Sequence, residues 1–206
     1  MPVTVQIKPP NFKMAVFALT GTAPLVIHRM AAKVKQEMKD KMETGKAASS
    51  KKNREPKNTD EIYNGARYIS KDGWDGLHAS SIRNAMISAC RLVQFKMTLA
   101  KLSVFVEADG WDKLEPQIPL IRIYGKPIKQ EDVAFTSTGQ PYITVRAAFH
   151  DWKAKVRIRW DGDQFTINDI TNLLSRVGMQ VGVGEGRPDS KNSCGMGWGM
   201  FTIDQK

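Results

Sequence analysis

The sequence is poor in the residues that support disulfide, redox or metal chemistry. Among its 206 residues there are two cysteines, Cys90 and Cys194, and three histidines. The cysteines form neither a close metal-ligand pair nor a disulfide framework, so a reducing, cytoplasmic setting is expected. Turn chemistry accounts for four aspartates beside Trp-Gly turns without a metal: Asp72, Asp75, Asp109 and Asp112. We expect no metal and no cofactor.

Long apolar runs and two common phosphate-binding motifs are also absent. No apolar stretch has the length that spans a bilayer. Residues 1–8 lack the charged start and apolar middle of a signal peptide, so no membrane association is expected. The Gly-Lys-Ser/Thr of a P-loop does not occur, and the C-terminal glycines do not lie between a strand and a helix, as a dinucleotide-binding loop requires.

Acidic residues are fewer than basic ones, and this imbalance is the first indication of a binding partner. There are 31 Lys and Arg against 21 Asp and Glu, which gives a formal net charge of +10. Such an excess favours a polyanion, with nucleic acid as the first candidate and an anionic membrane surface as the second. The length suits one domain with an insertion, or at most two small domains.

Glycine is concentrated near the C-terminus, where six of the 16 glycines fall within residues 181–201. Glycines let the backbone approach a ligand closely and adopt positive φ angles. Basic side chains lie in the polar stretch between the two groups of glycines, so an anion is the predicted ligand. A glycine-rich β-hairpin without a ligand is the alternative. The candidate contacts in this loop are Gly184, Gly186, Arg187 and Lys191.

A basic segment interrupts the first half of the chain. Residues 28–57 hold ten Lys and Arg against four Asp and Glu. Residues 29–43 are predicted to form a helix with a narrow apolar stripe of Met30, Val34, Met38 and Met42. Residues 44–60 have almost nothing to bury and are predicted to be a mobile loop. We interpret residues about 29–75 as a thumb-like, partly mobile insertion, either simply solvated or able to close over a nucleic-acid backbone.

The remaining segments alternate between strand and helix patterns. A predicted helix begins after the N-cap candidates Ser80 and Ser81, and another follows the cap Thr166 with Asp169 at its third position. The predicted strands are 12–19, 102–107, 117–124, a hairpin of 142–149 with 153–160, and 197–203. This order predicts an α+β fold with a ferredoxin-like, RRM-like β-α-β-β-α-β core. Its two helices should lie on one side of an antiparallel sheet.

The second arm of the predicted hairpin carries a one-sided charge pattern. Apolar residues at 154, 156, 158 and 160 alternate with four cations, Lys153, Lys155, Arg157 and Arg159. A period of two places the cations on one face of the strand. A solvated face usually mixes charges of both signs, so nucleic-acid contact through Lys155, Arg157 and Arg159 is predicted, with plain solvation as the alternative.

Three segments together resemble the RAMP superfamily, which includes backbone subunits and RNA-processing nucleases of CRISPR systems. Residues 20–25, Thr-Gly-Thr-Ala-Pro-Leu, are similar to the family's first-strand exit. Residues 77–85, Leu-His-Ala-Ser-Ser-Ile-Arg-Asn-Ala, are similar to its Pro-Gly-Ser-Ser-Leu-Lys-Gly-Ala helix start, although His78-Ala79 replaces Pro-Gly and Asn84 replaces Gly. Residues 182–199 resemble its C-terminal glycine-rich signature. More weakly, the chain resembles small proteins of tailed-phage genomes.

The resemblance implies one RAMP-like domain over residues 1–206, binding of single strands through backbone contacts, and self-assembly along the strand. By position, Arg83 matches the family's basic residue at the helix start. The expected partner is single-stranded DNA or RNA, bound with little sequence preference by a homo-oligomer in the cytoplasm, or in the host-cell cytoplasm for a phage protein. Candidate stacking residues are Tyr142, Phe149 and Trp198.

Two alternatives remain open at this point. Some RAMP relatives cut RNA without a metal, using histidine as general acid or base. The candidates for that role here are His28 and His78, which could share a cleft, although a structural role is the more common one for a lone histidine. An inhibitor that occupies a partner's nucleic-acid groove is the other alternative. Binding without catalysis is the favoured interpretation.

Overall fold

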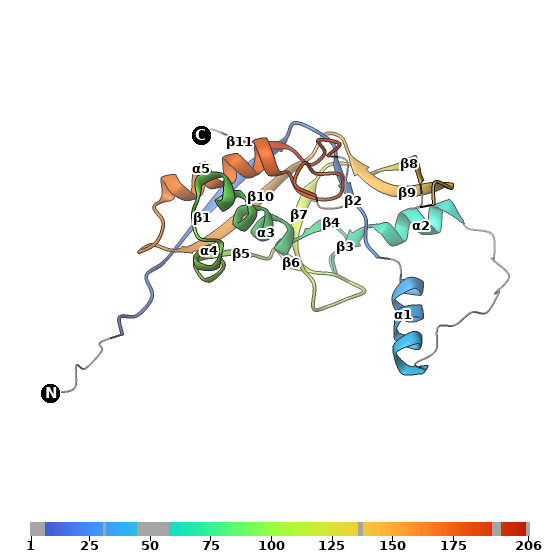
Figure 1. Cartoon of the computed structure of the whole chain (residues 1–206), viewed down its shortest axis with the longest axis horizontal. Helices are drawn as coiled ribbons and strands as arrows, with labels where there is room; N and C mark the ends of the chain where they lie inside the picture. Colours follow the sequence, from blue (N-terminus) through green and yellow to red (C-terminus); the bar gives the residue numbers. More distant parts are fainter. Residues whose placement is uncertain (1–6, 31, 45–57, 136–137, 191–194, 205–206) are drawn as a thin grey trace.

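The computed structural model describes residues 7–30, 32–44, 58–135, 138–190 and 195–204, which form an α+β fold (Figure 1). The strands are β1 (Phe12–Gly21), β2 (Leu25–Ile27), β3 (Tyr68–Ile69), β4 (Asp75–His78), β5 (Val104–Glu107), β6 (Gly110–Trp111), β7 (Pro119–Tyr124), β8 (Ile128–Phe135), β9 (Pro141–Phe149), β10 (Lys153–Asp161) and β11 (Phe201–Ile203). The helices are α1 (Ala32–Thr44), α2 (Thr59–Ala66), α3 (Ala79–Ala89), α4 (Met97–Ser103) and α5 (Ile167–Arg176), with a 3₁₀ turn η1 (Cys90–Val93) and a π-helical turn η2 (Val177–Val181). Within these described ranges, no helix is long and apolar enough to cross a membrane.

The larger sheet is built around β1 and β10. These strands pair antiparallel from Phe12 opposite Asp161 to Thr20 opposite Lys153. Strand β11 pairs with the other edge of β1, and β5 pairs with β10 near the end that carries Arg159. At its other end β10 pairs with β7, which leads to β4 and β3. The central order is therefore β11-β1-β10-β5, with every pairing antiparallel.

The core lies between this sheet and the helices α3 and α5, which pack against each other. The predicted alternation in β10 is confirmed, because Ala154, Val156, Ile158 and Trp160 are all buried. The predicted start of α5 is also confirmed, since Thr166 and Asp169 form a capping box. The buried stripe of α5 consists of Ile170, Leu173 and Leu174. The apolar residues of the strand β10, at a period of two, and those of the helix α5, at a period of 3.6, thus pack in one core.

The predicted hairpin of 142–149 with 153–160 is wrong. Strand β9 pairs with β8 and β2 in a separate three-stranded sheet, and β10 pairs with β1, β5 and β7. The chain changes sheets at Trp152, whose buried indole N–H donates to the Ala23 carbonyl at 2.9 Å. Sequence proximity favours a hairpin, but Trp152 at the connection is buried against Gly21 and Phe201, and the two strands pair with different partners.

Two smaller predictions also need correction. The N-cap of α3 is His78, not Ser80 or Ser81, because its Nδ1 accepts the Ser80 backbone N–H at 3.2 Å. The helix α1 forms as predicted, but its apolar stripe is not buried: Met30, Met38 and Met42 are all exposed. The mobile loop was predicted over residues 44–60, but Thr44 ends α1 and Thr59 begins α2. Residues 45–57 lie outside the described residues.

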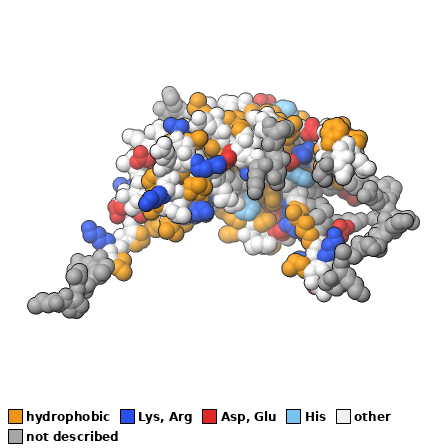
Figure 2. All heavy atoms as spheres, in the orientation of Figure 1, with side chains coloured by type: hydrophobic (Ala, Val, Ile, Leu, Met, Phe, Trp, Pro, Cys, Tyr) orange, Lys and Arg blue, Asp and Glu red, His pale blue; other side chains and the backbone are white. Residues whose placement is uncertain are grey.

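A two-stranded arm extends from the body. Strands β8 and β9, with α2 packed on β9, lie at the end of the molecule opposite to α4 and α5 (Figure 1). Figure 2 shows hydrophobic side chains gathered at the tip of this arm, where Val133, Phe135 and Ile143 are exposed.

Candidate nucleic-acid interface

The four cations of β10 lie on the sheet face opposite to the helices. Lys153 and Lys155 are exposed, and Arg157 and Arg159 are half-buried. Their neighbours on β1 show that this face is open to solvent, since Met14 is 60% and Val16 is 58% exposed. We call this surface, formed by alternate residues of β1, β5, β7 and β10, the open sheet face.

The cations of this face differ in how they are neutralised. Arg159 Nε lies 2.7 Å from Glu107 Oε1, and Arg157 Nη2 lies 3.0 Å from Asp109 Oδ1. Lys153 and Lys155 form no ion pair with any acid in the described part of the chain. A cation without an ion pair does not have to break a contact with a carboxylate when it binds a phosphate. The two lysines are therefore the groups on this face that are best suited to bind phosphates.

Aromatic rings accompany the arginine at one end of the open sheet face. The Arg159 guanidinium lies 4.6 Å from the Phe12 ring centroid and 4.7 Å from that of Phe105. Arg83, a predicted contact, reaches the same Phe105 ring from α3 at 5.2 Å. Its guanidinium also donates to the Val104 carbonyl at 2.9 Å, so it braces the edge strand β5. The sequence indicated Arg83 but not the two phenylalanines. For Phe12 the available signal was its spacing of two residues from Met14 and four from Val16 on one strand.

A second set of predicted residues meets in a cleft of about 640 Å³ in the body of the molecule, beside β2. Its walls come from β2, the start of α3 and the glycine-rich loop. The predicted residues that line it are His28, His78, Gly184 and Arg187. The expectation that His28 and His78 share a cleft is therefore confirmed.

One half-buried acid, Glu185, contacts two basic side chains at the cleft. Glu185 Oε1 lies 2.7 Å from Arg146 Nη2, and its Oε2 lies 3.1 Å from His28 Nδ1. Burial alone would raise the pKa of Glu185, but its contacts with His28 and Arg146 outweigh burial and lower it to about 2. Burial lowers the pKa of His78, which favours a neutral imidazole there. The cleft thus contains two histidines in different environments: His28 lies beside the Glu185 carboxylate, and His78 is partly desolvated.

The glycine-rich loop is shaped mainly by contacts with the protein itself. Gly184 has a φ of +77°, and an added Cβ would lie 2.6 Å from the Val26 carbonyl oxygen of β2. Arg187 Nη1 donates to the Gly184 carbonyl at 3.0 Å, which closes the turn. Gly186 lies under the Trp198 ring and does not line the cleft. Lys191 lies outside the described residues.

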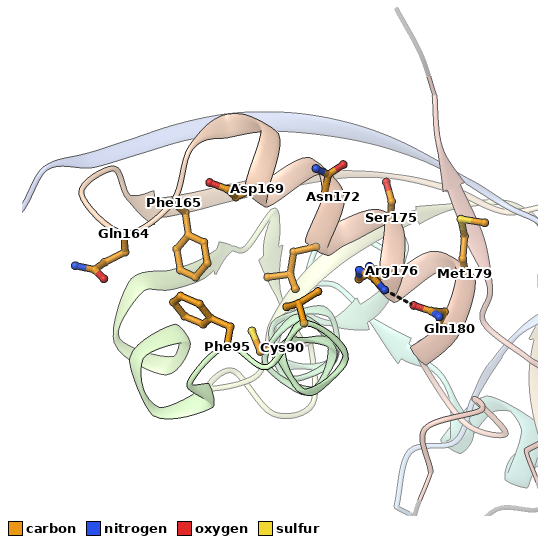
Figure 3. Close-up of a pocket in the computed structure, with 12 residues that line it drawn as sticks. Cys90, Phe95, Gln164, Phe165, Asp169, Asn172, Ser175, Arg176, Met179 and Gln180 are labelled. Atoms are coloured by element: carbon orange, nitrogen blue, oxygen red, sulfur yellow. Dashed lines mark hydrogen bonds between the residues drawn. The ribbon is translucent and has the colours of Figure 1, made fainter.

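The candidate stacking residues have separate positions. Phe149 is fully buried, so its predicted role in stacking is wrong. Trp198 is half-buried against the glycine-rich loop, and Tyr142 is exposed on the arm. A further cavity of about 820 Å³ lies between η1 and α5 on the helical side, where the Phe95 and Phe165 rings are 4.8 Å apart (Figure 3). Its floor is apolar, and none of the predicted contact residues line it.

Comparison with known protein families and curated proteins does not assign a function. No protein-family model matches the sequence, and no curated protein matches it. In the described residues, no group of three or more His, Cys, Asp or Glu side chains is arranged to hold a metal ion. The functional argument therefore rests on the surfaces of the molecule.

Proposed function

We propose that the protein binds single-stranded nucleic acid, DNA or RNA, with little sequence preference. The observation that carries this proposal is the open sheet face, where the unpaired cations Lys153 and Lys155 adjoin exposed apolar and aromatic side chains. Cations attract the phosphate backbone whatever the sequence. Aromatic rings stack on any unpaired base, and duplex bases are not available for such stacking.

We also infer a ferredoxin-like core and membership of the RAMP superfamily. The order β11-β1-β10-β5, with α3 between β1 and β5 and α5 between β10 and β11, supports the inference of a β-α-β-β-α-β core. The three segments that resemble the family support this inference, as does the glycine-rich loop lying beside the start of α3. Assembly into a homo-oligomer along the strand belongs to the same proposal.

The salt dependence of oligonucleotide binding tests the proposal. We expect wild-type affinity for a single strand to fall steeply with salt. Lys153→Ala with Lys155→Ala should reduce the log–log slope by about 1.4, at about 0.7 per lost contact. The control is Lys96→Ala with Arg176→Ala, which removes two cations from the helical side and should leave the slope unchanged. Binding that hardly responds to salt would exclude this mechanism, and a protein that binds no free oligonucleotide would favour the inhibitor alternative.

A second candidate function is metal-independent cleavage of RNA in the cleft. Its support is the pairing of the desolvated His78 with His28 beside Glu185, because a base and an acid are both needed for proton transfer. We expect any cleavage of a labelled RNA in the presence of a chelator to fall by a factor of about 10² or more in His28→Ala or His78→Ala. Unchanged cleavage by both variants would assign the activity to a contaminant.

A further inference from the structure

A second group of aromatic and basic side chains lies at the other end of the open sheet face. Arg122 lies 5.0 Å from the Tyr124 ring centroid and 6.0 Å from that of Trp74. Tyr124 is opposite Lys153 in the sheet register, so both side chains lie on the same face. We call Trp74, Arg122 and Tyr124 the β7 cluster. It lies outside the central four strands and includes none of the residues predicted as contacts.

Two glycines make room for the Trp74 ring against the sheet. A Cβ added at Gly76 of β4 would lie 3.2 Å from the Trp74 ring, and one added at Gly110 of β6 would lie 2.8 Å from it. The indole therefore rests on two stretches of backbone, and it is only half-buried. An aromatic ring supported from below and partly exposed above is the geometry of a stacking platform.

The two ends of the open sheet face have matching chemistry. At the first end Arg159 lies against the Phe12 and Phe105 rings, and at the second end Arg122 lies against two further rings. Arg159 and Lys153 are six residues apart on β10, which corresponds to about 20 Å. Lys155 and Arg157 lie between them on the same face. Two aromatic groups are thus joined by a line of cations.

We propose that the β7 cluster is a second base-stacking site, so that one strand runs along β10 and stacks at both ends of the open sheet face. This inference rests on the proposed single-strand binding. The separation corresponds to about six nucleotides at a rise of 3.4 Å each, and to fewer in an extended strand. Phosphates between the two stacked ends would lie over Lys155 and Arg157.

Tyr124→Ala tests the cluster, with Phe135→Ala at the tip of the arm as the control. Tyr124 is 45% and Phe135 is 66% exposed, so neither change removes core packing. We expect Tyr124→Ala to weaken binding of a ten-nucleotide oligothymidylate roughly five- to hundredfold, because one stacked base is lost. The salt slope should stay at the wild-type value, since no charge is removed. Tyr124→Phe, which keeps the ring, should bind like wild type.

The outcomes separate this inference from the proposed function. A wild-type protein that binds the oligonucleotide with a steep salt slope, together with Tyr124→Ala that binds equally well, would overturn the second site and leave the function in place. Equal losses in Tyr124→Ala and Phe135→Ala would also overturn it, because stacking would not be located at the β7 cluster. Absence of any wild-type binding would overturn the proposed function itself.

Discussion

Gly199→Ala is expected to lower the free energy of unfolding by about 3–5 kcal/mol, through strain and the loss of two backbone hydrogen bonds. Gly199 has a φ of +68°, and an added Cβ would lie 1.8 Å from the Val183 carbonyl oxygen. Since the obstructing atom belongs to the backbone, the two segments must separate. Separation would break the bonds from Val183 N–H to Gly199 O, at 3.1 Å, and from Gly199 N–H to Pro24 O, at 2.8 Å.

Gly197→Ala is the matched control for this change. Its φ of +75° is similar, but an added Cβ would meet nothing within 4 Å. Only the backbone preference is lost there, which costs about 1–2 kcal/mol. Urea unfolding followed by circular dichroism measures both variants on one scale. Equal losses in the two variants would show that the contact with Val183 is relieved without cost, contrary to this account.

The sequence predicted much of the core because its signals there are local. The alternation of β10, the capping box at Thr166 and the stripe of α5 each depend on residues within one element, and each is found in the structure. The helix α4 was missed, because its seven residues give too short a pattern to separate from the strand that follows. The pairing of β9 was also missed, since it depends on β8 and β2, which are distant or were not recognised as strands.

The candidate site was predictable in composition but not in arrangement. The cations of β10 were found because they repeat at a period of two, and their placement on one face follows from strand geometry. Their neutralisation was not predictable, because Glu107 and Asp109 come from β5 and the loop that follows it. Likewise Tyr124 meets Lys153 only through the register of β7 with β10, which depends on packing of the whole sheet.

A buried ion pair joins the start of the predicted insertion to the turn after β6. Asp112 is fully buried and Arg29 is 6% exposed, and their closest charged atoms are 2.9 Å apart. Asp112 Oδ2 also accepts the backbone N–H groups of Leu114 and Glu115, at 3.1 and 2.7 Å. The turn chemistry predicted for this aspartate is therefore present. Its carboxylate also forms an ion pair with Arg29, at the start of the predicted insertion.

Asp112→Ala is expected to lower the free energy of unfolding by about 3 kcal/mol. Among the described residues, Glu115, at 2.5 Å, would be the one acidic partner left to the buried Arg29 charge, and two backbone N–H groups would lose their acceptor. Thermal and urea unfolding at pH 7 measure the loss. Asp72→Ala is the control, because that carboxylate is exposed in the neighbouring turn and its removal should cost no more than about 0.5 kcal/mol. A loss in Asp112→Ala no greater than in the control would show that the Arg29–Asp112 pair does not hold the insertion to the sheet.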